Sequence, residues 1–364
     1  NWANWETFVA VQASRVQDID DLDVTKSVRS RDVTQAVNRL TALVADDMER
    51  VNATIIENMQ SDVALIPQLA GYLIASGGKR LRPLLTLACA RLCGLTVGDE
   101  AVRLAASVEF IHTATLLHDD VVDDSSLRRG SASANAVWGN KASVLVGDFL
   151  YSGAFQLMVS TQNLATLKTL ADASAVIASG EVAQLATAND LNTNHQDYLD
   201  VIEAKTAALF AAACQVGGEA ARTSASQVEA VRDYGHNLGM AFQLIDDALD
   251  YSADQEKLGK TVGDDFAEGK VTLPVLLAFE AGDADEQAFW RRTIEDLDQT
   301  SGDLDHAKTL IAKHHALAGT VEAAEQYGQR ASDALARLAP SYGDAQDIRE
   351  ALQDVIAFCI VRGH

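Results

Sequence analysis

Proline is scarce in this chain, and its scarcity constrains the fold more than any other sequence feature. Only four prolines occur in 364 residues, and none lies between Pro83 and Pro274. Proline interrupts helices because it lacks a backbone donor and its ring clashes with the preceding turn. Alanine and leucine, which both favour helices, dominate much of the sequence. We therefore predict an all-α fold, with a single large helical domain over residues 31–364.

Hydrophobic periodicity divides this domain into predicted helices separated by polar turns. The two longest buried-looking helices cover residues 97–124 and 231–253. We also predict a polar-faced helix over about residues 32–62, and Gly94 as the C-cap of a helix that begins near residue 84. Other helices are predicted over residues 62–76, 140–160, 174–188 and 198–218, with a loop over 254–274 and amphipathic helices after it.

Residues 1–30 are predicted to form a peripheral extension. This stretch lacks a basic start followed by a long apolar centre, so it does not resemble a signal peptide. No stretch approaches about 20 uninterrupted apolar residues, so we expect no transmembrane segment. The four cysteines lack partners at metal-binding spacing, and we expect buried, reduced thiols in a cytoplasmic protein. They are Cys89, Cys93, Cys214 and Cys359.

The chain is strongly acidic, with a formal net charge of −23 from 52 Asp and Glu residues and 29 Lys and Arg residues. Nucleic acids and anionic membrane surfaces attract basic proteins, so this balance argues against both as partners. An anionic small molecule would need a local basic cluster or bound metal ions. The positions of the few Lys and Arg residues are therefore informative.

The first of the two long helices ends in four aspartates within six positions, at residues 119–124. Residues three or four apart share a helix face, so Asp119 and Asp123 lie on one polar stripe. His112 and Thr115 lie farther back along the same stripe. Two carboxylates one turn apart repel each other unless cations bind, and magnesium prefers oxygen ligands of this kind.

The second long helix ends in a similar pattern, in which Gln243, Asp246, Asp247 and Asp250 lie at helical spacing. A single pattern of this kind is also typical of an acidic, solvated helix end. Two of them, each on a largely apolar helix, instead predict a clamp that holds a diphosphate through metal ions across a cleft. Asp120 and Asp124 point to an adjacent face of the first helix and are candidates for a supporting role.

Basic residues gather beside these motifs in three groups. Arginine forks match phosphate oxygens, and lysine supplies a compact charge. Surface ion pairing is an alternative for any single group, but the repetition in so acidic a chain favours phosphate binding. The groups are Lys79, Arg80 and Arg82; Arg128 and Arg129; and Lys257, Lys260 and Lys270.

Five motifs occur in an order that resembles the trans-isoprenyl diphosphate synthases, and in particular their long-chain, octaprenyl-to-decaprenyl branch. The resemblance covers roughly residues 35–364. It implies an α-helical fold around a deep cavity, usually in a homodimer, and successive head-to-tail addition of isopentenyl diphosphate to an allylic diphosphate. The motifs are GGKRLRP at 77–83, LLHDDVVDDSSLRRG at 116–130, KT at 205–206, GMAFQLIDDALDY at 239–251 and KLGKTVGDDFAEGKVTLP at 257–274.

The resemblance also implies a role for each matching residue. The predicted magnesium ligands, for about three ions per active site, are Asp119, Asp123 and Asp246, with Asp120, Asp247 and Asp250 supporting them directly or through water. The predicted allylic diphosphate contacts are Arg128 and Lys260, with Lys270 as a further candidate in a variable loop. The predicted isopentenyl diphosphate site is Lys79, Arg82, His112 and Arg129. Beside the reacting carbon we expect Lys205, Thr206 and Gln243.

These residue types suit the implied chemistry. Metal ions and basic side chains stabilise the charge that develops on departing diphosphate. The carbonyl oxygens of Lys205 and Thr206 and the amide oxygen of Gln243 can stabilise an allylic cation. No side chain stands out as a general base, and the resemblance implies that the diphosphate itself removes the proton.

Product length is expected to depend on the space below the first aspartate motif. Ala114 and Thr115 lie five and four positions before Asp119. In shorter-product relatives bulky aromatics block the cavity there, so the small residues of this chain imply an open tunnel and a long product. Close packing of Ala114 against another helix is the alternative. Glu181 and Gln184 either lie near this cavity or simply permit close helix contact.

Other classes of protein share some of these features but differ from a long-chain synthase. A terpene cyclase would need only one substrate diphosphate, and a non-catalytic subunit of a heteromeric synthase usually loses one aspartate motif. A pure helical scaffold leaves the paired motifs unexplained. A shorter-chain, geranylgeranyl-type synthase is the nearest alternative. Supply of a quinone side chain, such as that of ubiquinone, and peripheral membrane contact at product release are further expectations from the resemblance.

Overall fold

The computed structural model describes residues 36–75, 79–95, 98–128, 131–252, 263–338 and 343–361. Within these ranges almost all regular structure is helical, which confirms the predicted all-α fold. The predicted extension over residues 1–30 lies outside the described residues. The same is true of Arg129, Lys257 and Lys260.

The described helices follow one another with short connections. Residues 36–43 are also helical and precede the first labelled element. The elements are α3 (Ala45–Asn58), α4 (Leu65–Ala75), α5 (Leu81–Leu92), α6 (Asp99–Val122), β1 (Leu127–Arg128), β2 (Ser131–Ala132), α7 (Ala134–Trp138), α8 (Asn140–Ser160), α9 (Leu164–Thr187), α10 (His195–Ile202), η2 (Glu203–Ala207), α11 (Ala208–Ala220), α12 (Ala225–Asp250), α13 (Asp264–Ala267), α14 (Leu273–Ala281), α15 (Ala284–Trp290), η4 (Arg291–Glu295), α16 (Asp303–Lys313), α17 (Ala316–Ala336) and α18 (Ala345–Val361).

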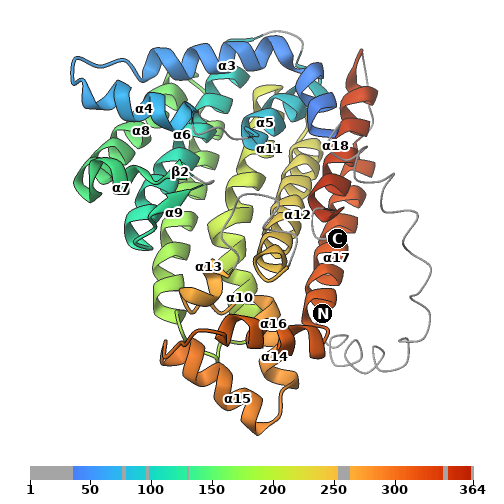
Figure 1. Cartoon of the computed structure of the whole chain (residues 1–364). Coiled ribbons are helices and arrows are strands. Elements are labelled where there is room, and N and C mark those ends of the chain that lie inside the picture. The colour runs from blue at the N-terminus through green and yellow to red at the C-terminus, as the bar shows by residue number, and fades with distance from the viewer. Residues whose placement is uncertain are drawn as a thin grey trace.

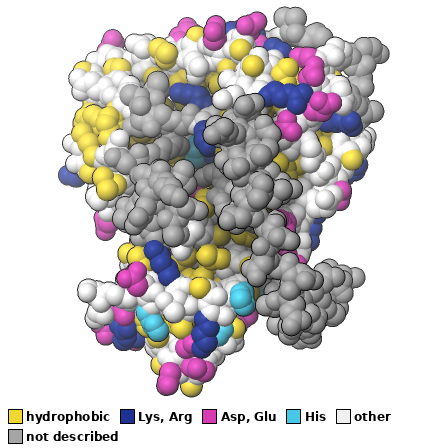
Figure 2. Space-filling model, turned by 45° about the vertical axis from the view of Figure 1, so that its right-hand side comes forward, with side chains coloured by type: hydrophobic (Ala, Val, Ile, Leu, Met, Phe, Trp, Pro, Cys, Tyr) yellow, Lys and Arg dark blue, Asp and Glu magenta, His cyan; other side chains and the backbone are white. Residues whose placement is uncertain are grey.

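Long helices run side by side through the middle of the molecule (Figure 1). Helix α11 packs against α5, α9 and α12, while α12 also packs against α17 and α6 packs against α8. Helices α3 and α4 lie across one end, and α14 to α16 lie at the other. Acidic and basic side chains and histidines are interspersed on that second end (Figure 2).

Three apolar cores hold these helices together. The largest joins α3, α5, α6, α8, α9, α11 and α18, and contains Phe110 and Phe210. A second core lies between the C-terminal half of α12 and helices α10, α14 and α17, and the third lies beneath α13 to α16. Burial of apolar area is the main stabilising term in such packing. Both aspartate motifs therefore sit at the ends of helices whose bodies are fixed in a core.

Local sequence signals set several helix ends. Asn163 caps α9, Ser224 caps α12, and Asp283 forms a capping box with Glu286 at the start of α15. Helix α6 begins with acidic residues in its first turn, where they suit the helix dipole. Its buried residues are distributed around the helix, as its apolar sequence predicts.

A glycine permits the close approach that builds the site. A Cβ atom at Gly239 of α12 would lie 2.7 Å from the Cα of Ala207 in η2. No larger residue fits there without displacing backbone. The contact brings the second aspartate helix directly against the turn that carries Lys205 and Thr206.

The structure corrects some predicted elements. The helix predicted over residues 32–62 is interrupted by a turn at Val44. The single helix predicted over 198–218 contains a π-helical turn, η2. The predicted loop over 254–274 includes the short helix α13, and a small antiparallel hairpin of β1 and β2 was not predicted. Hydrophobic periodicity does not distinguish a short interruption at Val44 or the π-helical turn η2 from a continuous α-helix.

All four cysteines are free, as predicted, although Cys93 is only half-buried. Helix α8 is the one described helix with the length and apolar character of a membrane span, with a mean hydropathy of 1.4 over its most apolar window. Half of that window is buried inside the structure, where α8 packs against α6 and α7. Core helices often meet the same criteria, so this is weak evidence for a span.

Candidate active site

The first aspartate motif lies at the C-terminal end of α6. The backbone N–H of Asp123 donates to the carbonyl oxygen of Asp119 at 2.8 Å, which places the two residues one turn apart as predicted. The pKa of Asp119 is raised to about 7, mainly by burial; the charges of Glu181 and Asp123 contribute to the rise, and Lys205 opposes it. Asp119 therefore lies in an acidic environment that a bound cation would relieve.

The side chain of Asp120, the next residue, contacts Arg128. Its carboxylate is buried and accepts hydrogen bonds from the Arg128 guanidinium, from Nε at 2.7 Å and Nη2 at 2.6 Å. Asn135 donates to its backbone carbonyl at 2.9 Å. Asp120 thus fixes Arg128 beside the motif, and both predicted residues are brought together. Arg128 retains other N–H donors for a ligand.

The predicted isopentenyl diphosphate residues gather around the start of α5. Arg82 Nη1 lies 3.2 Å from His112 Nε2, and its guanidinium stacks 4.3 Å above the centre of the Phe210 ring. The Lys79 ammonium lies 4.2 Å from the centre of the Phe358 ring in α18. Cation–π contacts of this kind hold a basic group in place without neutralising it.

Lys205 and Thr206 sit in the π-helical turn η2. Such turns widen a helix locally and often occur at functional sites. The Lys205 ammonium donates to Glu181 Oε2 and to Gln184 Oε1, both at 3.0 Å and both on α9. Lys205 also lies near enough to Asp119 to lower its pKa. The turn therefore connects α9 with the first aspartate motif.

A hydrogen-bonded series leads from η2 into the second aspartate motif. The Thr206 hydroxyl donates to Gln243 Oε1 at 2.7 Å, and Gln243 Nε2 donates to Asp247 Oδ1 at 2.7 Å. The Tyr198 hydroxyl donates to the other carboxylate oxygen, Asp247 Oδ2, at 2.6 Å. Burial and the nearby charge of Asp265 raise the pKa of Asp247, while the donors from Tyr198 and Gln243 lower it.

The remaining aspartates of this motif lie close by. Asp250 is buried and accepts a hydrogen bond from the backbone N–H of Asp265 at 3.1 Å. Asp246 is half-buried, and its charge contributes to the raised pKa values of Asp247 and Asp265. Asp246 thus lies at the more accessible side of the motif, whereas Asp247 and Asp250 point into the protein.

Lys270 lies between the two motifs. Its ammonium lies 2.5 Å from Glu268 and 3.5 Å from Asp265. Burial lowers the pKa of Lys270, but the charges of Asp265, Glu268 and Asp123 together raise it above its ordinary value. Because Asp123 belongs to the first motif and Asp265 adjoins the second, Lys270 lies within electrostatic range of both motifs.

The two predicted product-length positions are placed below the first motif. Ala114 is fully buried in the largest core. Thr115 is half-buried, and its hydroxyl donates to the backbone carbonyl of His112 at 2.8 Å. On the same helix, Phe110 packs against α8 at Gly153, where an added Cβ would lie 3.1 Å from its ring.

The donor set of the two motifs fits magnesium. The ligand atoms that they offer are carboxylate oxygens, and Asp119 and Asp123 are spaced to share ions. Within the described ranges no three His, Cys, Asp or Glu side chains are grouped closely enough to hold an ion by themselves. Magnesium usually completes its coordination with water and substrate phosphates, so a site of separated carboxylates suits it.

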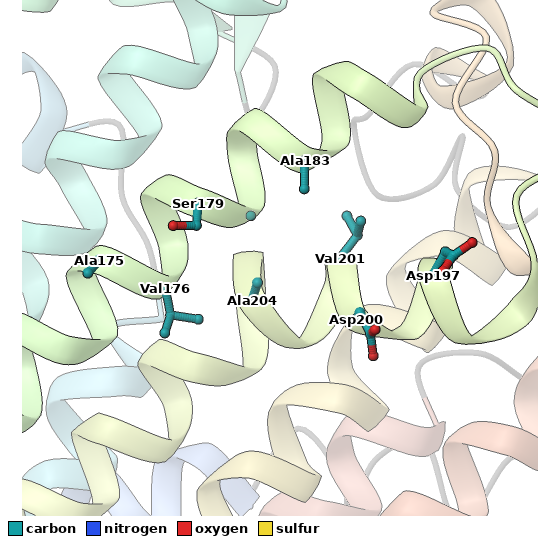
Figure 3. Close-up of a pocket in the computed structure, with 9 residues that line it drawn as sticks. Ala175, Val176, Ser179, Ala183, Asp197, Asp200, Val201 and Ala204 are labelled. Atoms are coloured by element: carbon teal, nitrogen blue, oxygen red, sulfur yellow. The ribbon is translucent and has the colours of Figure 1, made fainter.

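A separate surface groove of about 520 Å³ lies on the outer side of η2, between α9 and α10 (Figure 3). Small and apolar side chains line most of it, with Asp197 and Asp200 along one side. A Cβ atom at Gly180 would lie 2.6 Å from the Cβ of Ala204, so the two elements touch there. None of the predicted site residues lines this groove.

Comparison with known proteins agrees with this geometry. Residues 63–311 match the model of the polyprenyl synthetase family. The chain is 46% identical over 300 residues to octaprenyl diphosphate synthase from Haemophilus influenzae, covering 82% of this chain and 91% of that protein. It is 51% identical over 259 residues to octaprenyl diphosphate synthase from Escherichia coli, covering 71% of this chain and 80% of that protein.

Two solved structures are similar over nearly the whole chain. One is a polyprenyl synthase from Caulobacter crescentus in complex with calcium and isoprenyl diphosphate, with a TM-score of 0.85, 52% identity and coverage of 90% of this chain and 98% of that chain. The other is a decaprenyl diphosphate synthase from Rhodobacter capsulatus, with a TM-score of 0.85, 50% identity and coverage of 90% and 99%.

The chain therefore belongs to the polyprenyl synthetase family. It is a prenyltransferase of the all-α isoprenoid synthase fold, and its family uses isopentenyl diphosphate and an allylic diphosphate with a general dependence on metal ions. Within the family it is a long-chain polyprenyl diphosphate synthase. The shorter-chain and non-catalytic alternatives are not favoured.

Sequence reasoning missed some residues that the structure brings to the site. Tyr198 contacts Asp247 of the second aspartate motif, although it lies outside all five of the sequence motifs. Glu181 and Gln184 were noted only as possible neighbours of the cavity, and both bind Lys205. Asp265 lies within the motif at 257–274, but no contact with the second aspartate motif was predicted for it. Helical spacing identifies residues on one helix, whereas these contacts join different helices.

Proposed function

We propose that this chain is a magnesium-dependent synthase that extends an allylic diphosphate to a product of about eight to ten isoprene units, the lengths named for its octaprenyl and decaprenyl relatives. One observation supports this proposal above all others. The aspartate motifs end two core helices, α6 and α12, and the Lys205–Thr206 turn and Lys270 lie between them. Both motifs can therefore act on one diphosphate.

The allylic diphosphate is held by groups from both motifs. Magnesium ions, held by Asp119, Asp123 and Asp246, would neutralise the diphosphate and stabilise the charge that develops as it departs. Arg128, fixed by Asp120, faces the same group with its remaining N–H donors. Asp247 and Asp250 support the motif from behind. Arg129, Lys260 and Lys270 remain proposed diphosphate contacts.

The π-helical turn η2 prepares the site for the allylic cation. The carbonyl oxygens of Lys205 and Thr206 and the amide oxygen of Gln243 are the proposed stabilising groups. Thr206 already donates to Gln243 Oε1, which orients that oxygen toward the turn. Lys205 is paired with Glu181 and can exchange this partner for diphosphate when substrate binds. The surrounding apolar core excludes water, which would otherwise quench the cation.

The second substrate occupies the basic site at the start of α5. Lys79, Arg82 and His112 would bind the isopentenyl diphosphate, with its alkene directed toward the allylic carbon. The alkene attacks C1 of the allylic cation, a carbon–carbon bond forms, and a proton is lost to the released diphosphate. Because Arg82 is already held by His112 and Phe210, this basic site needs little ordering for each addition.

The growing chain extends along α6, below the first motif. The small side chains of Ala114 and Thr115 are the proposed means of leaving room for the chain, where a bulky side chain would stop elongation. A length of about eight to ten units is supported by the small residues at these positions and by the octaprenyl and decaprenyl relatives.

A second copy of this chain is the proposed partner. Helices α8 and α9 expose several large apolar side chains to solvent, among them Leu145 at 66% and Val182 at 67%. Exposed patches of this kind mark interaction surfaces. Replacement of both residues by glutamate should convert a dimer to a monomer in analytical ultracentrifugation. A parent chain that sediments as a monomer at all concentrations would exclude the homodimer.

We also propose a cytoplasmic location with peripheral membrane contact at product release, and supply of a quinone side chain as the downstream use. The apolar product supports both proposals, because a long prenyl chain partitions into lipid. Cell fractionation followed by quinone analysis of a depleted strain would test them.

The function is tested by product analysis. Purified protein is incubated with farnesyl diphosphate and labelled isopentenyl diphosphate, with magnesium or with a chelator. A magnesium-dependent product of about eight to ten units is expected. A short product would retain the chemistry and overturn the tunnel argument. No elongation with varied primers and detergent would overturn the proposed function.

A further inference from the structure

The Tyr198 hydroxyl is held at the junction of three helices. Tyr198 lies on α10 and is only 4% exposed. It packs in the apolar core that α10 shares with α12 and α14, and its hydroxyl donates to Asp247 Oδ2 on α12 at 2.6 Å. A hydroxyl group carries one proton, and the Tyr198 proton is directed at the Asp247 carboxylate.

Asp247 transmits this orientation to Gln243. The NH₂ of Gln243 faces Asp247, because Gln243 Nε2 donates to Asp247 Oδ1 at 2.7 Å. The amide oxygen of Gln243 then faces the opposite way, where the Thr206 hydroxyl donates to it at 2.7 Å. The Tyr198 hydroxyl, the Gln243 amide and the Thr206 hydroxyl each donate to a defined acceptor, and such a connected series strengthens its individual hydrogen bonds.

We propose that Tyr198 is a positioning residue for the condensation step. It holds Asp247 in the rotamer that makes Gln243 present its amide oxygen, rather than its NH₂, beside the reacting carbon. A partial negative charge there attracts the allylic cation, whereas the reversed amide would repel it. This inference rests on the role that the proposed function gives to Gln243.

The burial of the contact explains why a hydroxyl is required. Without it, Asp247 Oδ2 would face an apolar ring in a buried site, and the carboxylate would turn to find another donor. Gln243 would then lose the acceptor that fixes its NH₂ and could rotate by half a turn. The defect is one of orientation, so substrate binding at Lys79, Arg82 and Arg128 should be preserved.

The test compares Tyr198→Phe with Tyr234→Phe in the full chain. Tyr234 is a matched control: it is fully buried, lies on α12, and donates its hydroxyl to the carbonyl of Leu352 at 3.0 Å, away from both motifs. Turnover is measured with farnesyl diphosphate and labelled isopentenyl diphosphate at saturating magnesium. Binding of inorganic diphosphate with magnesium is measured by calorimetry, and folding by circular dichroism.

We expect Tyr198→Phe to lower kcat about ten- to a hundredfold, with KM for isopentenyl diphosphate and the diphosphate affinity within about twofold of the parent. Tyr234→Phe should keep the parent kcat. An unchanged kcat in Tyr198→Phe would overturn the inference. So would an equal loss in both variants, or a loss carried by KM alone, because those results indicate general core packing or substrate binding.

A double variant separates this inference from the proposed function. If Tyr198 acts through Gln243, adding Tyr198→Phe to Gln243→Ala should lower kcat by less than about twofold further. A full additional loss would contradict action through Gln243. Parent-like turnover in Gln243→Ala alone would instead remove Gln243 from the site, which is a failure of the proposed function itself.

Discussion

The two aspartate motifs differ in how neighbouring groups of the protein hold them. At the end of α12, Asp247 and Asp250 are buried and fixed by hydrogen bonds from Tyr198, Gln243 and the backbone of Asp265. At the end of α6, Asp119 is half-buried among Glu181, Asp123 and Lys205, and its pKa is raised to about 7 by burial and these carboxylates.

This difference suggests a division of labour between the motifs. The second motif is preorganised, so its side chains need little rearrangement when substrate arrives. In both motifs neighbouring carboxylates raise one another's pKa, and ions entering with the substrate diphosphate would relieve this repulsion. Ion binding at the first motif, where the pKa of Asp119 is about 7, is therefore expected to depend on pH near neutrality.

The largest expected effect is the loss of either motif. Asp119→Asn and Asp246→Asn should each lower turnover about a thousandfold or more, because each removes a charge that holds ions against the departing diphosphate. Steady-state assays on proteins with parent-like circular dichroism spectra would measure this loss.

Asp124→Asn is the matched control for these variants. Asp124 is exposed and adopts a left-handed conformation with a φ of 49°, which asparagine tolerates. Its turnover should stay within about threefold of the parent. Parent-like turnover in Asp119→Asn or Asp246→Asn would refute the ion-holding assignment for that motif.

The next effect concerns the tunnel below the first motif. Ala114→Phe should shorten the product by several isoprene units, because a bulky ring would occupy the space along α6. The matched control is Ala105→Phe, which is equally buried but lies nine positions earlier, on the opposite face of the helix. Chromatography of labelled products resolves the lengths. The same product distribution in both folded variants would exclude Ala114 from the tunnel.

A smaller effect should appear in the pH dependence of magnesium binding. With a pKa of about 7, Asp119 is protonated below neutral pH, and magnesium must displace that proton. The apparent magnesium affinity should therefore fall about tenfold between pH 8 and pH 6. Calorimetric titrations in the presence of inorganic diphosphate would measure it. Asp119→Asn should bind more weakly and lose this dependence, and an equally steep slope in that variant would assign it to another group.

The smallest effect is on stability without metal. The folded-state pKa of Asp119 is raised above its unfolded value near 3.8, so its contribution to stability is present at low pH and is lost as pH rises through about 7. Asp119→Asn should thus stabilise the metal-free protein at pH 8 by about 1 kcal/mol, given its partial exposure.

Denaturant titrations at pH 8 and pH 5 would measure this change. The gain should shrink at pH 5, where the parent carboxyl is already protonated. If Asp119→Asn instead destabilised the protein at pH 8, the ionised Asp119 carboxylate would not be the source of instability that its raised pKa predicts.

The sequence was sufficient to predict the all-α fold and the two motifs at helix ends, because helical spacing is local. It placed Asp119 and Asp123 one turn apart and grouped Gln243 with Asp247, as the structure confirms. It did not predict η2, because a π-helical turn leaves no signature in hydrophobic periodicity.

Contacts between residues of different helices could not be predicted from the spacing of residues along one helix. The contact from Tyr198 to Asp247 joins α10 to α12, and that from Lys205 to Glu181 joins η2 to α9. The pairing of Arg128 with Asp120 depends on the turn between α6 and β1, which helical spacing does not describe. Lys260 and Arg129 stay predictions, since they lie outside the described residues.

The central claim is that both motifs hold ions on one diphosphate. The most direct measurement is a crystal structure of the full chain with manganese and inorganic diphosphate, in which anomalous scattering locates the ions. The account predicts ions that contact Asp119 and Asp123 on one side and Asp246 on the other, with the contacts among Tyr198, Asp247 and Gln243 unchanged. Ions bound to only one motif, or a diphosphate bound away from both, would contradict it.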